Sequence, residues 1–270
     1  MTDSKTKLVC VIGKPARHSL SPIMHNAAYS ALGINYSYLA FEPENLKKAV
    51  EGLAELEVAG FNVTMPFKEQ IIKYLDSVDK IAQKIGAVNC VVNSNGKLIG
   101  YNTDGVGSVA ALKKISSIKG KSVLVLGCGG AGKAIGFYLN EEGASITFSD
   151  SSSAKAKGLA KSLGAKSVKM GSIKSLEGFD ILINASPVGM KPNQNQTPIP
   201  SELLYPGLVV FDVVYDPIET KLLQDAKSLG CKTINGLEML LEQGFASFEL
   251  FTKKQAPQEV MRRAILEAIE

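Results

Sequence analysis

The sequence predicts an α/β protein with two domains, the second built on a doubly wound parallel sheet of the Rossmann type. Two alternating series of short apolar runs and helical patterns support this fold class. The first series closes with a hairpin, because Asn95-Gly96 separates two strand patterns. The second series opens with an apolar run at 122–126 that stops at Gly127 and passes directly into a helical pattern.

The first hundred residues read as a complete α/β domain. Ser21 is expected to cap the first helix, with Pro22 at its first position. The buried side of that helix is expected to consist of Ile23, Met24, Ala27, Ala28, Ala31 and Leu32. Strands are predicted at 8–13, 37–41, 60–64, 90–93 and 98–101, and helices at 21–33, 44–56, 68–74 and 79–85.

The second series follows a helix predicted at 106–114. Its strand and helix patterns alternate, which favours a parallel sheet with helices on both faces. Two helical segments close the chain, and either domain could supply the apolar surface that they need. Strands are predicted at 122–126, 145–149, 167–170, 180–184, 208–213 and 232–234, and helices at 131–141, 153–163, 220–229, 237–252 and 258–269.

The composition is that of a globular protein, with 45% hydrophobic and 21% charged residues. A net charge of +4 and a pI of about 8.7 suit attraction of a phosphorylated cofactor. The lysines are scattered and no basic run alternates with aromatics, so nucleic acid is not an expected partner. No signal-like or membrane-spanning run is present, so we expect a cytoplasmic protein without a membrane partner.

Cysteine and histidine usage argues against disulfides and metal sites. The four cysteines, at positions 10, 90, 128 and 231, form no Cys-x-x-Cys pair. Buried free thiols in a reducing compartment are therefore expected. Since His18 and His25 are the only histidines, no metal site is expected either.

A glycine-rich turn follows the strand at 122–126, with the spacing Gly127-x-Gly129-x-x-Gly132. In a dinucleotide site the first glycine allows the tight turn and the second leaves room for the pyrophosphate. The N–H groups at the start of the helix then meet the phosphate charge. A plain glycine-rich turn explains the same spacing, so both interpretations stay open. The expected cofactor contacts in this turn are Gly127, Gly129, Gly130, Ala131 and Gly132.

A nicotinamide site also needs a group that transfers the proton accompanying the hydride. Lys68 follows the strand at 60–64, and Asp104 follows the strand at 98–101. Burial would lower the pKa of the lysine and the carboxylate would orient it, so the two could act as an acid/base pair. The alternative is a surface lysine and an aspartate that caps the helix at 106–114.

Other polar residues of the first domain could contact a ligand. Ser19 and Ser21 place two hydroxyls beside a helix N-terminus, which suits a carboxylate or a polyol. Ser21 could equally serve only as a helix cap. Asn89 is either a turn residue or a partner for a substrate hydroxyl.

A set of short motifs occurs in order from about residue 9 to 247. The set comprises Gly13-x-Pro15, His18-Ser19-x-Ser21-Pro22, Asn62-Val-Thr64-x-Pro66-x-Lys68, Gly86-Ala-Val-Asn89, Gly100-x-Asn102-Thr-Asp104-Gly105-x-Gly107, the turn 127–132, Asn184-Ala-Ser186-Pro187-x-Gly189-Met190, Asp212-x-x-Tyr215 and Gly236-x-x-Met239-Leu240-x-x-Gln243. In this order they resemble the shikimate dehydrogenase family. No single motif is conclusive, but the ordered set is specific.

The resemblance implies reversible reduction of 3-dehydroshikimate to shikimate by NADPH, a step in chorismate and aromatic amino-acid biosynthesis. It implies that Lys68 is the catalytic acid/base, paired with Asp104. It also implies a substrate and catalytic domain at 1–104, a dinucleotide-binding domain at 105–236, and helices at 237–270 that return to the first domain. Further implied contacts are Ser19, Ser21 and Tyr215 for the carboxylate, Thr64, Asn89, Asp104 and Gln243 for the ring hydroxyls, and Val213 and Gly236 for the nicotinamide.

One segment departs from the family pattern. Where relatives usually carry an Asn-Arg-Thr run for the 2′-phosphate of NADP, this chain has Asp150-Ser151-Ser152-Ser153-Ala154-Lys155. Asp150 lies at about the 20-residue offset at which a carboxylate binds the ribose of NAD. It could instead cap the helix that starts near Ser153, and Ser151, Ser152 and Lys155 could still contact a phosphate. NADP is the working assignment, with NAD as the alternative.

Relatives that prefer quinate often differ in the serine pair, so the resemblance implies that Ser19 and Ser21 favour shikimate as the substrate. An NAD-preferring quinate/shikimate dehydrogenase is the alternative enzyme. A non-catalytic dinucleotide sensor is the alternative from another class, although it would not need Lys68 and Asp104. A homodimer is allowed for as the assembly.

Overall fold

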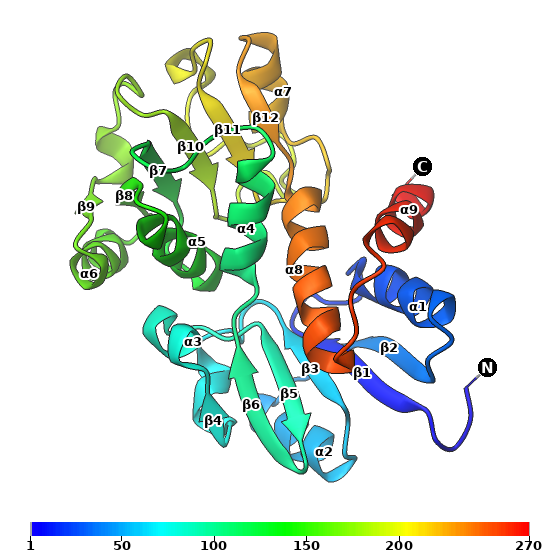
Figure 1. The fold of residues 1–270 in the computed structure, drawn as a ribbon. Helices are drawn as coiled ribbons and strands as arrows, with labels where there is room; N and C mark the ends of the chain where they lie inside the picture. Colours follow the sequence, from blue (N-terminus) through cyan, green and yellow to red (C-terminus); the bar gives the residue numbers. More distant parts are fainter. Residues whose placement is uncertain (1, 270) are drawn as a thin grey trace. The chain divides into compact units, whose positions relative to one another are not determined.

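The computed structural model describes residues 2–269 and contains two compact units, each with its own sheet (Figure 1). The first unit combines Met1–Thr103 with Gln243–Glu270, and the second is Asp104–Glu242. The second division falls inside the long helix α8 (Gly236–Thr252). Within residues 2–269, no helix is both long enough and apolar enough to cross a membrane.

The first unit holds a mixed six-stranded sheet. Its strands are β1 (Lys7–Ile12), β2 (Tyr36–Phe41), β3 (Gly60–Val63), β4 (Ser77–Val78), β5 (Cys90–Ser94) and β6 (Lys97–Tyr101). Their order is β2-β1-β3-β5-β6-β4, with β1, β2 and β3 parallel and β5 antiparallel to β3. The predicted hairpin of β5 and β6 is confirmed, and Asn95 and Gly96 both have the positive φ that its tight turn needs. The short strand β4 carried no sequence signal.

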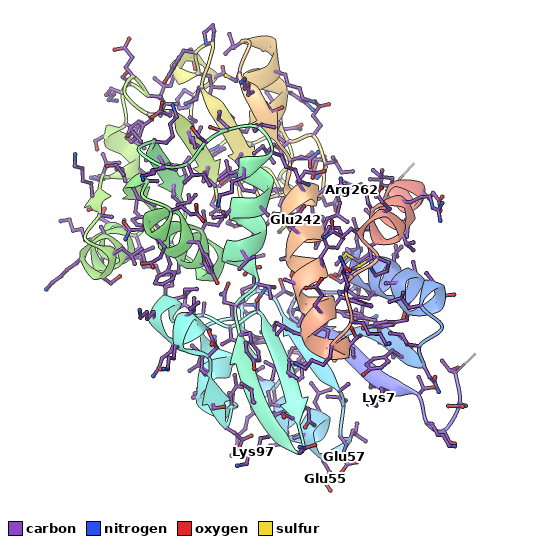
Figure 2. The ribbon with its side chains drawn as sticks, viewed as in Figure 1. Lys7, Glu55, Glu57, Lys97, Glu242 and Arg262 are labelled. Atoms are coloured by element: carbon purple, nitrogen blue, oxygen red, sulfur yellow. The ribbon has the colours of Figure 1, made fainter. Side chains whose placement is uncertain are left out.

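The helices of the first unit are α1 (Ser21–Ala31), α2 (Leu46–Glu55), α3 (Lys80–Ile85), α9 (Gln258–Ile269) and the second part of α8. Helix α9 packs beside α1 (Figure 1). The helix predicted at 68–74 is only a short 3₁₀ turn, η1 (Gln70–Tyr74). Side chains cover both units, and Figure 2 shows Lys97 at the hairpin and Glu242 on α8.

Two expectations for α1 are wrong. Ser21 is already the first helical residue, and Leu20 precedes it without a capping side chain. The buried side is also rotated, because Ile23 and Leu32 are exposed while two polar-tipped rings face the interior. The apolar residues of α1 lie on more than one side of the helix, so the spacing of apolar residues alone does not predict which side is buried. That side consists of Ser21, Met24, His25, Ala28 and Tyr29.

The second unit is a six-stranded parallel sheet in the order β12-β11-β10-β7-β8-β9. Its strands are β7 (Ser122–Leu126), β8 (Ser145–Ser149), β9 (Lys166–Ser167), β10 (Ile181–Asn184), β11 (Val209–Asp212) and β12 (Lys232–Ile234). Read from β7 outward, this is the Rossmann order, and chain direction across the sheet switches between β7 and β10. The strand expected at 167–170 is shorter than predicted and is followed by the 3₁₀ turn η2 (Met170–Ser172).

Both faces of this sheet are buried, which confirms the doubly wound prediction. Val123 and Val125 point into one core, and Leu124 and Leu126 point into the other. Alternate residues of a strand face opposite sides, so a continuous apolar run serves both cores. The helices of this unit are α4 (Asp104–Lys113), α5 (Gly130–Glu141), α6 (Ser153–Leu163), α7 (Lys221–Ser228) and the first part of α8.

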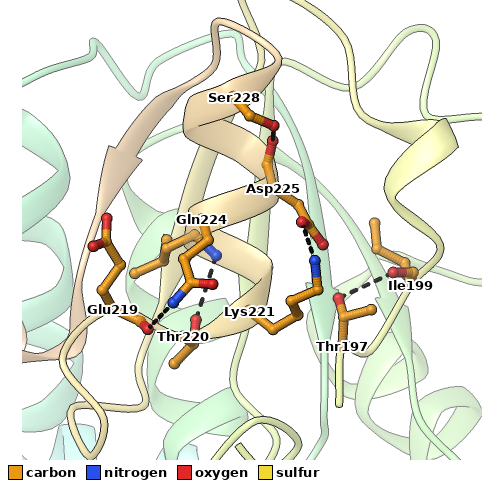
Figure 3. A network of polar contacts seen from close by, with 9 residues as sticks. Thr197, Ile199, Glu219, Thr220, Lys221, Gln224, Asp225 and Ser228 are labelled. Carbon is orange, nitrogen blue, oxygen red and sulfur yellow. Dashed lines mark hydrogen bonds and ion pairs between the residues drawn. The ribbon is translucent and has the colours of Figure 1, made fainter. Parts of the chain in front are cut away.

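Helix α7 illustrates how local polar contacts define helix ends (Figure 3). The Thr220 hydroxyl caps its N-terminus by accepting the N–H of Leu223. Gln224 donates to the Glu219 carbonyl oxygen, and Lys221 pairs with Asp225 one turn later. The Lys221–Asp225 ion pair contributes only about 0.3–0.5 kcal/mol, as is usual for helical pairs near the surface.

All four cysteines are free thiols. Cys10, Cys90 and Cys128 are buried as expected, whereas Cys231 is only partly buried. Burial raises the pKa of the Cys10 thiol and the Cys128 thiol to about 12, with the nearby Asp150 adding to the rise at Cys128. These thiols are therefore protonated and unreactive at neutral pH.

Candidate functional site

The first unit gathers several predicted site residues at the ends of β1 and β3. These strands are parallel neighbours, with Ile12 beside Val63, so the loops that follow them leave the same edge of the sheet. Gly13 permits a close approach here, because a Cβ at this position would lie 2.0 Å from the Cγ2 of Thr64. Lys14 N–H then donates to the Met65 carbonyl oxygen at 2.7 Å. The loop after β1 is therefore held against the loop that carries Thr64.

The loop after β1 presents the two predicted serines. The Ser19 hydroxyl accepts the backbone N–H of Ser21 at 3.2 Å, which brings the two residues together at the start of α1. Glu42 anchors the loop by accepting the N–H groups of Ala16 and Arg17 at 2.7 and 2.9 Å. These hydrogen bonds lower the pKa of the Glu42 carboxyl. Glu42 carried no signal in the sequence.

Asn89 lies just before β5 and is 2% exposed. Its amide is held by Thr103, whose N–H donates to Oδ1 at 2.7 Å and whose hydroxyl accepts from Nδ2 at 2.9 Å. The same Nδ2 donates to Gln243 Oε1 at 3.4 Å. Two predicted contacts that are far apart in the chain are thus neighbours in the first unit.

A buried polar ring supports Asn89 from behind. Asn62 Nδ2 donates to the Asn89 carbonyl oxygen and to Ser247 Oγ, both at 3.0 Å. Ser247 Oγ in turn lies 3.2 Å from Thr103 Oγ1. Asn62 and Thr103 lie inside the predicted motifs, but the sequence predicts a site role only for their neighbours in those motifs. Ser247 could not be found from the sequence, because it lies in an apolar helix with no accompanying pattern.

Lys68 is half-buried on the turn after β3. Its carbonyl oxygen accepts the N–H of Val88 at 2.8 Å, next to Asn89 in sequence, so its backbone is fixed beside that segment. Asp104 belongs to the second unit, is 3% exposed and is the first residue of α4. The expectation that Asp104 precedes the helix as a cap is therefore wrong. The pairing of Lys68 with Asp104 stays a prediction.

The glycine turn of the second unit has the geometry that close phosphate approach requires. Gly127 has a φ of 100°, which strongly favours glycine, and a Cβ there would lie 2.8 Å from the carbonyl carbon of Ala185. A Cβ at Gly132 would lie 2.0 Å from the Gly127 carbonyl oxygen. At Gly129, by contrast, a Cβ would meet nothing within 4 Å. Gly129 is exposed and directly precedes α5, whose first residues are Gly130, Ala131 and Gly132. The N–H groups at the start of a helix attract anions.

Asp150 is tied to this turn by its carboxylate. Oδ2 accepts the N–H of Cys128 at 2.8 Å, and Oδ1 accepts the N–H of Ser152 at 2.8 Å. The Ser151 hydroxyl also donates to Oδ1 at 3.3 Å. The alternative that Asp150 caps α6 is wrong, because Ser152 is the cap and accepts the N–H of Lys155. Ser151 and Lys155 are exposed beside the turn.

Val213 and Gly236 also come together in the second unit. A Cβ at Gly236 would lie 2.3 Å from the Val213 carbonyl oxygen, so only glycine fits this contact. The segment is organised by buried Asp212, which accepts from Asn184 Nδ2, Thr220 Oγ1 and the N–H of Val214. Burial raises the pKa of Asp212 to about 6, and those hydrogen bonds oppose the rise. Tyr215 follows, half-buried.

Metal chemistry has no visible support in the part of the chain that is described. No group of three or more His, Cys, Asp or Glu side chains there is arranged to hold a metal ion.

Comparison with known proteins gives a consistent result along the whole chain. Residues 11–91 match the family described as shikimate dehydrogenase substrate binding domain, and residues 236–266 match the shikimate 5′-dehydrogenase C-terminal domain. The shikimate dehydrogenase (NADP(+)) of Methanocaldococcus jannaschii is 45% identical, with 100% of this chain and 99% of that protein covered. That of Methanococcus maripaludis is 48% identical, with 98% of each covered. A crystal structure of shikimate dehydrogenase in complex with NADP+ superposes with a TM-score of 0.95 at 43% identity, covering 100% of this chain and 98% of that one.

Proposed function

Because the chain belongs to the shikimate dehydrogenase family, we propose that it catalyses the reversible NADP-dependent reduction of 3-dehydroshikimate to shikimate. The predicted family assignment is thereby confirmed. The structural observation that carries the proposal is the contact between Asn89 and Gln243, supported by Thr103, at one edge of the first unit. A polyol substrate needs amide groups of this kind, since they can donate to some hydroxyls and accept from others.

We assign substrate binding to the first unit and dinucleotide binding to the second. In this assignment Ser19 and Ser21 bind the substrate carboxylate together with Tyr215. Thr64, Asn89, Asp104 and Gln243 hold the ring hydroxyls. The fixed loop after β1 and the buried support of Asn89 favour this division, because a preorganised site loses less entropy on binding.

Lys68 is proposed as the acid that delivers a proton to the substrate ketone oxygen, and as the base in the reverse direction. Asp104 is proposed to hold the lysine and a ring hydroxyl in position. A positioned acid/base group contributes roughly 10²–10⁴-fold to rate. Lys68 suits this role because its backbone is fixed beside the Asn89 segment, which would keep the ammonium near the bound ring.

The glycine turn fits NADP. Bound NADPH would supply the hydride that reduces the ketone. The open space at Gly129 and the start of α5 suit the pyrophosphate. Ser151, Ser152 and Lys155 are the proposed contacts of the 2′-phosphate, while Val213 and Gly236 line the nicotinamide. The Asp150 carboxylate already accepts three protein donors, which weakens the alternative that it selects NAD.

Two broader features are proposed for testing. The four free thiols suit a reducing compartment such as the cytoplasm. Leu39 and Phe41 are 46% and 42% exposed on the edge strand β2, which favours contact with a second copy in a homodimer. Light scattering that reports only a monomer would contradict the dimer.

The decisive experiment follows reduction of the cofactor by absorbance at 340 nm. Four arms pair NADP or NAD with shikimate or quinate, and a fifth omits the substrate. We expect NADP with shikimate to have the highest kcat/KM, by at least tenfold. A higher kcat/KM with quinate and NAD would favour the alternative enzyme. Cofactor binding without turnover in any arm would favour a sensor and contradict the proposal.

A further inference from the structure

Tyr38 lies behind the proposed substrate site and touches its supporting amide. It occupies the middle of β2 and has no exposed surface. Its hydroxyl donates to Asn62 Oδ1 at 2.8 Å. The Asn62 amide nitrogen uses its two hydrogens on the Asn89 carbonyl oxygen and on Ser247 Oγ. The Asn62 oxygen therefore faces Tyr38, and this position needs a donor.

The same tyrosine is fixed to α1, the helix that begins at Ser21. Asn26 of α1 clamps its backbone, accepting the Tyr38 N–H at 2.8 Å and donating to the Tyr38 carbonyl oxygen at 2.9 Å. The ring stacks on His25 with centroids 4.5 Å apart and planes 12° apart. Burial raises the pKa of the Tyr38 phenol. The phenol oxygen thus contacts Asn62, while the backbone and ring of Tyr38 are held by α1.

We propose that Tyr38 is a positioning residue that ties the Asn62–Asn89 pair, on the hydroxyl side of the substrate site, to α1, the helix that begins at Ser21. This inference rests on the proposed function. Tyr38 itself does not touch the substrate. Its hydroxyl fixes which way the Asn62 amide points, and Asn62 in turn holds the backbone of Asn89.

The chain supplies a matched control in Tyr29. This residue is also buried and packs in the same aromatic cluster, with its ring 5.5 Å from Phe248 and 5.2 Å from Tyr36. Within residues 2–269, however, the Tyr29 hydroxyl has no hydrogen-bond partner. Removing the Tyr29 oxygen therefore tests the loss of a buried hydroxyl without the loss of the contact to Asn62.

The test compares Tyr38→Phe with Tyr29→Phe in steady-state kinetics. We expect Tyr38→Phe to raise the KM for shikimate about tenfold, with the KM for NADP unchanged and kcat altered less than threefold. Loss of one buried hydrogen bond has about this effect when it loosens a binding group. Tyr29→Phe should leave all three constants within a factor of two.

Ser247→Ala provides a second route if Tyr38→Phe does not fold. It removes a second side-chain contact that orients the Asn62 amide and should raise the KM for shikimate in the same selective way. An unchanged KM for shikimate, equal changes in both KM values, or the same effect in Tyr29→Phe would each overturn the inference. The wild-type protein is assayed before any variant. If it does not reduce NADP in the presence of shikimate, the proposed function is overturned, and this inference with it.

Discussion

The carboxylate of Asp150 accepts the backbone N–H of Cys128, with 2.8 Å between Oδ2 and the nitrogen. This contact joins the end of β8 to the glycine turn after β7. A second hydrogen bond, from the N–H of Ser152 to Oδ1, ties the start of α6 to the same side chain. Asp150 therefore braces the two loops that form the proposed NADP site, rather than standing ready for a ribose hydroxyl.

Replacing Asp150 with Asn separates these two roles. If Asp150 braces the turn, Asp150→Asn should raise the KM for NADP about tenfold and leave the KM for shikimate unchanged, because an amide cannot accept at both positions. If the carboxylate mainly repels the 2′-phosphate, the same change should lower the KM for NADP. Steady-state kinetics with NADP and with NAD shows whether the KM for NADP rises or falls.

Asp180→Asn is the control for that experiment. Asp180 also accepts a backbone N–H in the second unit, from Ser122 at 2.8 Å, but at the opposite end of β7. It should affect stability without a selective change in the KM for NADP. An equal rise in both variants would mean that general loosening of the unit, and not the turn, causes the effect.

Alanine substitutions at two glycines of the turn should have different effects, one on NADP binding and the other on stability. Gly129→Ala places a methyl group in open space at a φ of −76°, so we expect its Tm to stay within about 2 °C of wild type. The methyl would occupy the pyrophosphate position and raise the KM for NADP at least tenfold. Gly132→Ala would press on the Gly127 carbonyl oxygen and should lower the Tm by several degrees. Thermal unfolding and kinetics on both variants check this; equal Tm values would contradict it.

Lys68→Ala should lower kcat by roughly 10³-fold, because it removes the proposed proton donor. Binding of NADP should change by less than threefold, since Lys68 belongs to the first unit and the glycine turn to the second. Single-turnover kinetics and calorimetric titration with NADP measure the two quantities. A kcat near the wild-type value would refute the acid/base role.

His25 predicts an acid-sensitive stability. Complete burial lowers its pKa from 6.5 to about 3, and neither ring nitrogen has a hydrogen-bond partner within residues 2–269. The unfolded chain therefore binds a proton below pH 6.5 that the folded chain does not bind. This histidine should cost about 1.4 kcal/mol of unfolding free energy per pH unit between pH 6.5 and 3.

His25→Phe keeps the ring stack on Tyr38 and removes the titrating group. We expect the variant to be more stable than wild type, with a gap that widens as the pH falls from 7 to 4. Urea unfolding at several pH values measures the gap. His18→Gln, at the other and exposed histidine, should show no such widening. A gap that is constant with pH would contradict the burial argument.

Local patterns in the sequence are enough to predict the alternation of strands and helices, the hairpin at Asn95-Gly96, the glycine turn and the family. Each of these depends on local chemistry: apolar periodicity, the positive φ of glycine, or short motifs in a fixed order. The errors in the predictions for α1 have local causes as well. The sequence does not predict the rotation of α1, because apolar residues occur on several sides of this helix. It predicts Ser21 as a cap because serine before proline is a common helix start, whereas Ser21 is the first helical residue.

The contacts between residues that are distant in the chain depend on how the sheet and its helices pack. Strand pairing placed Asn62 beside Asn89, and α8 brought Ser247 into contact with Asn62 and Thr103. The structure also shows that Asp150 accepts a hydrogen bond from the glycine turn and that Tyr38 donates one to Asn62. Within residues 2–269 the Tyr29 hydroxyl makes no such bond. The physical reason is that a hydrogen bond depends on distance and direction in space. Side chains separated by tens of residues acquire these only when the sheet and its helices pack.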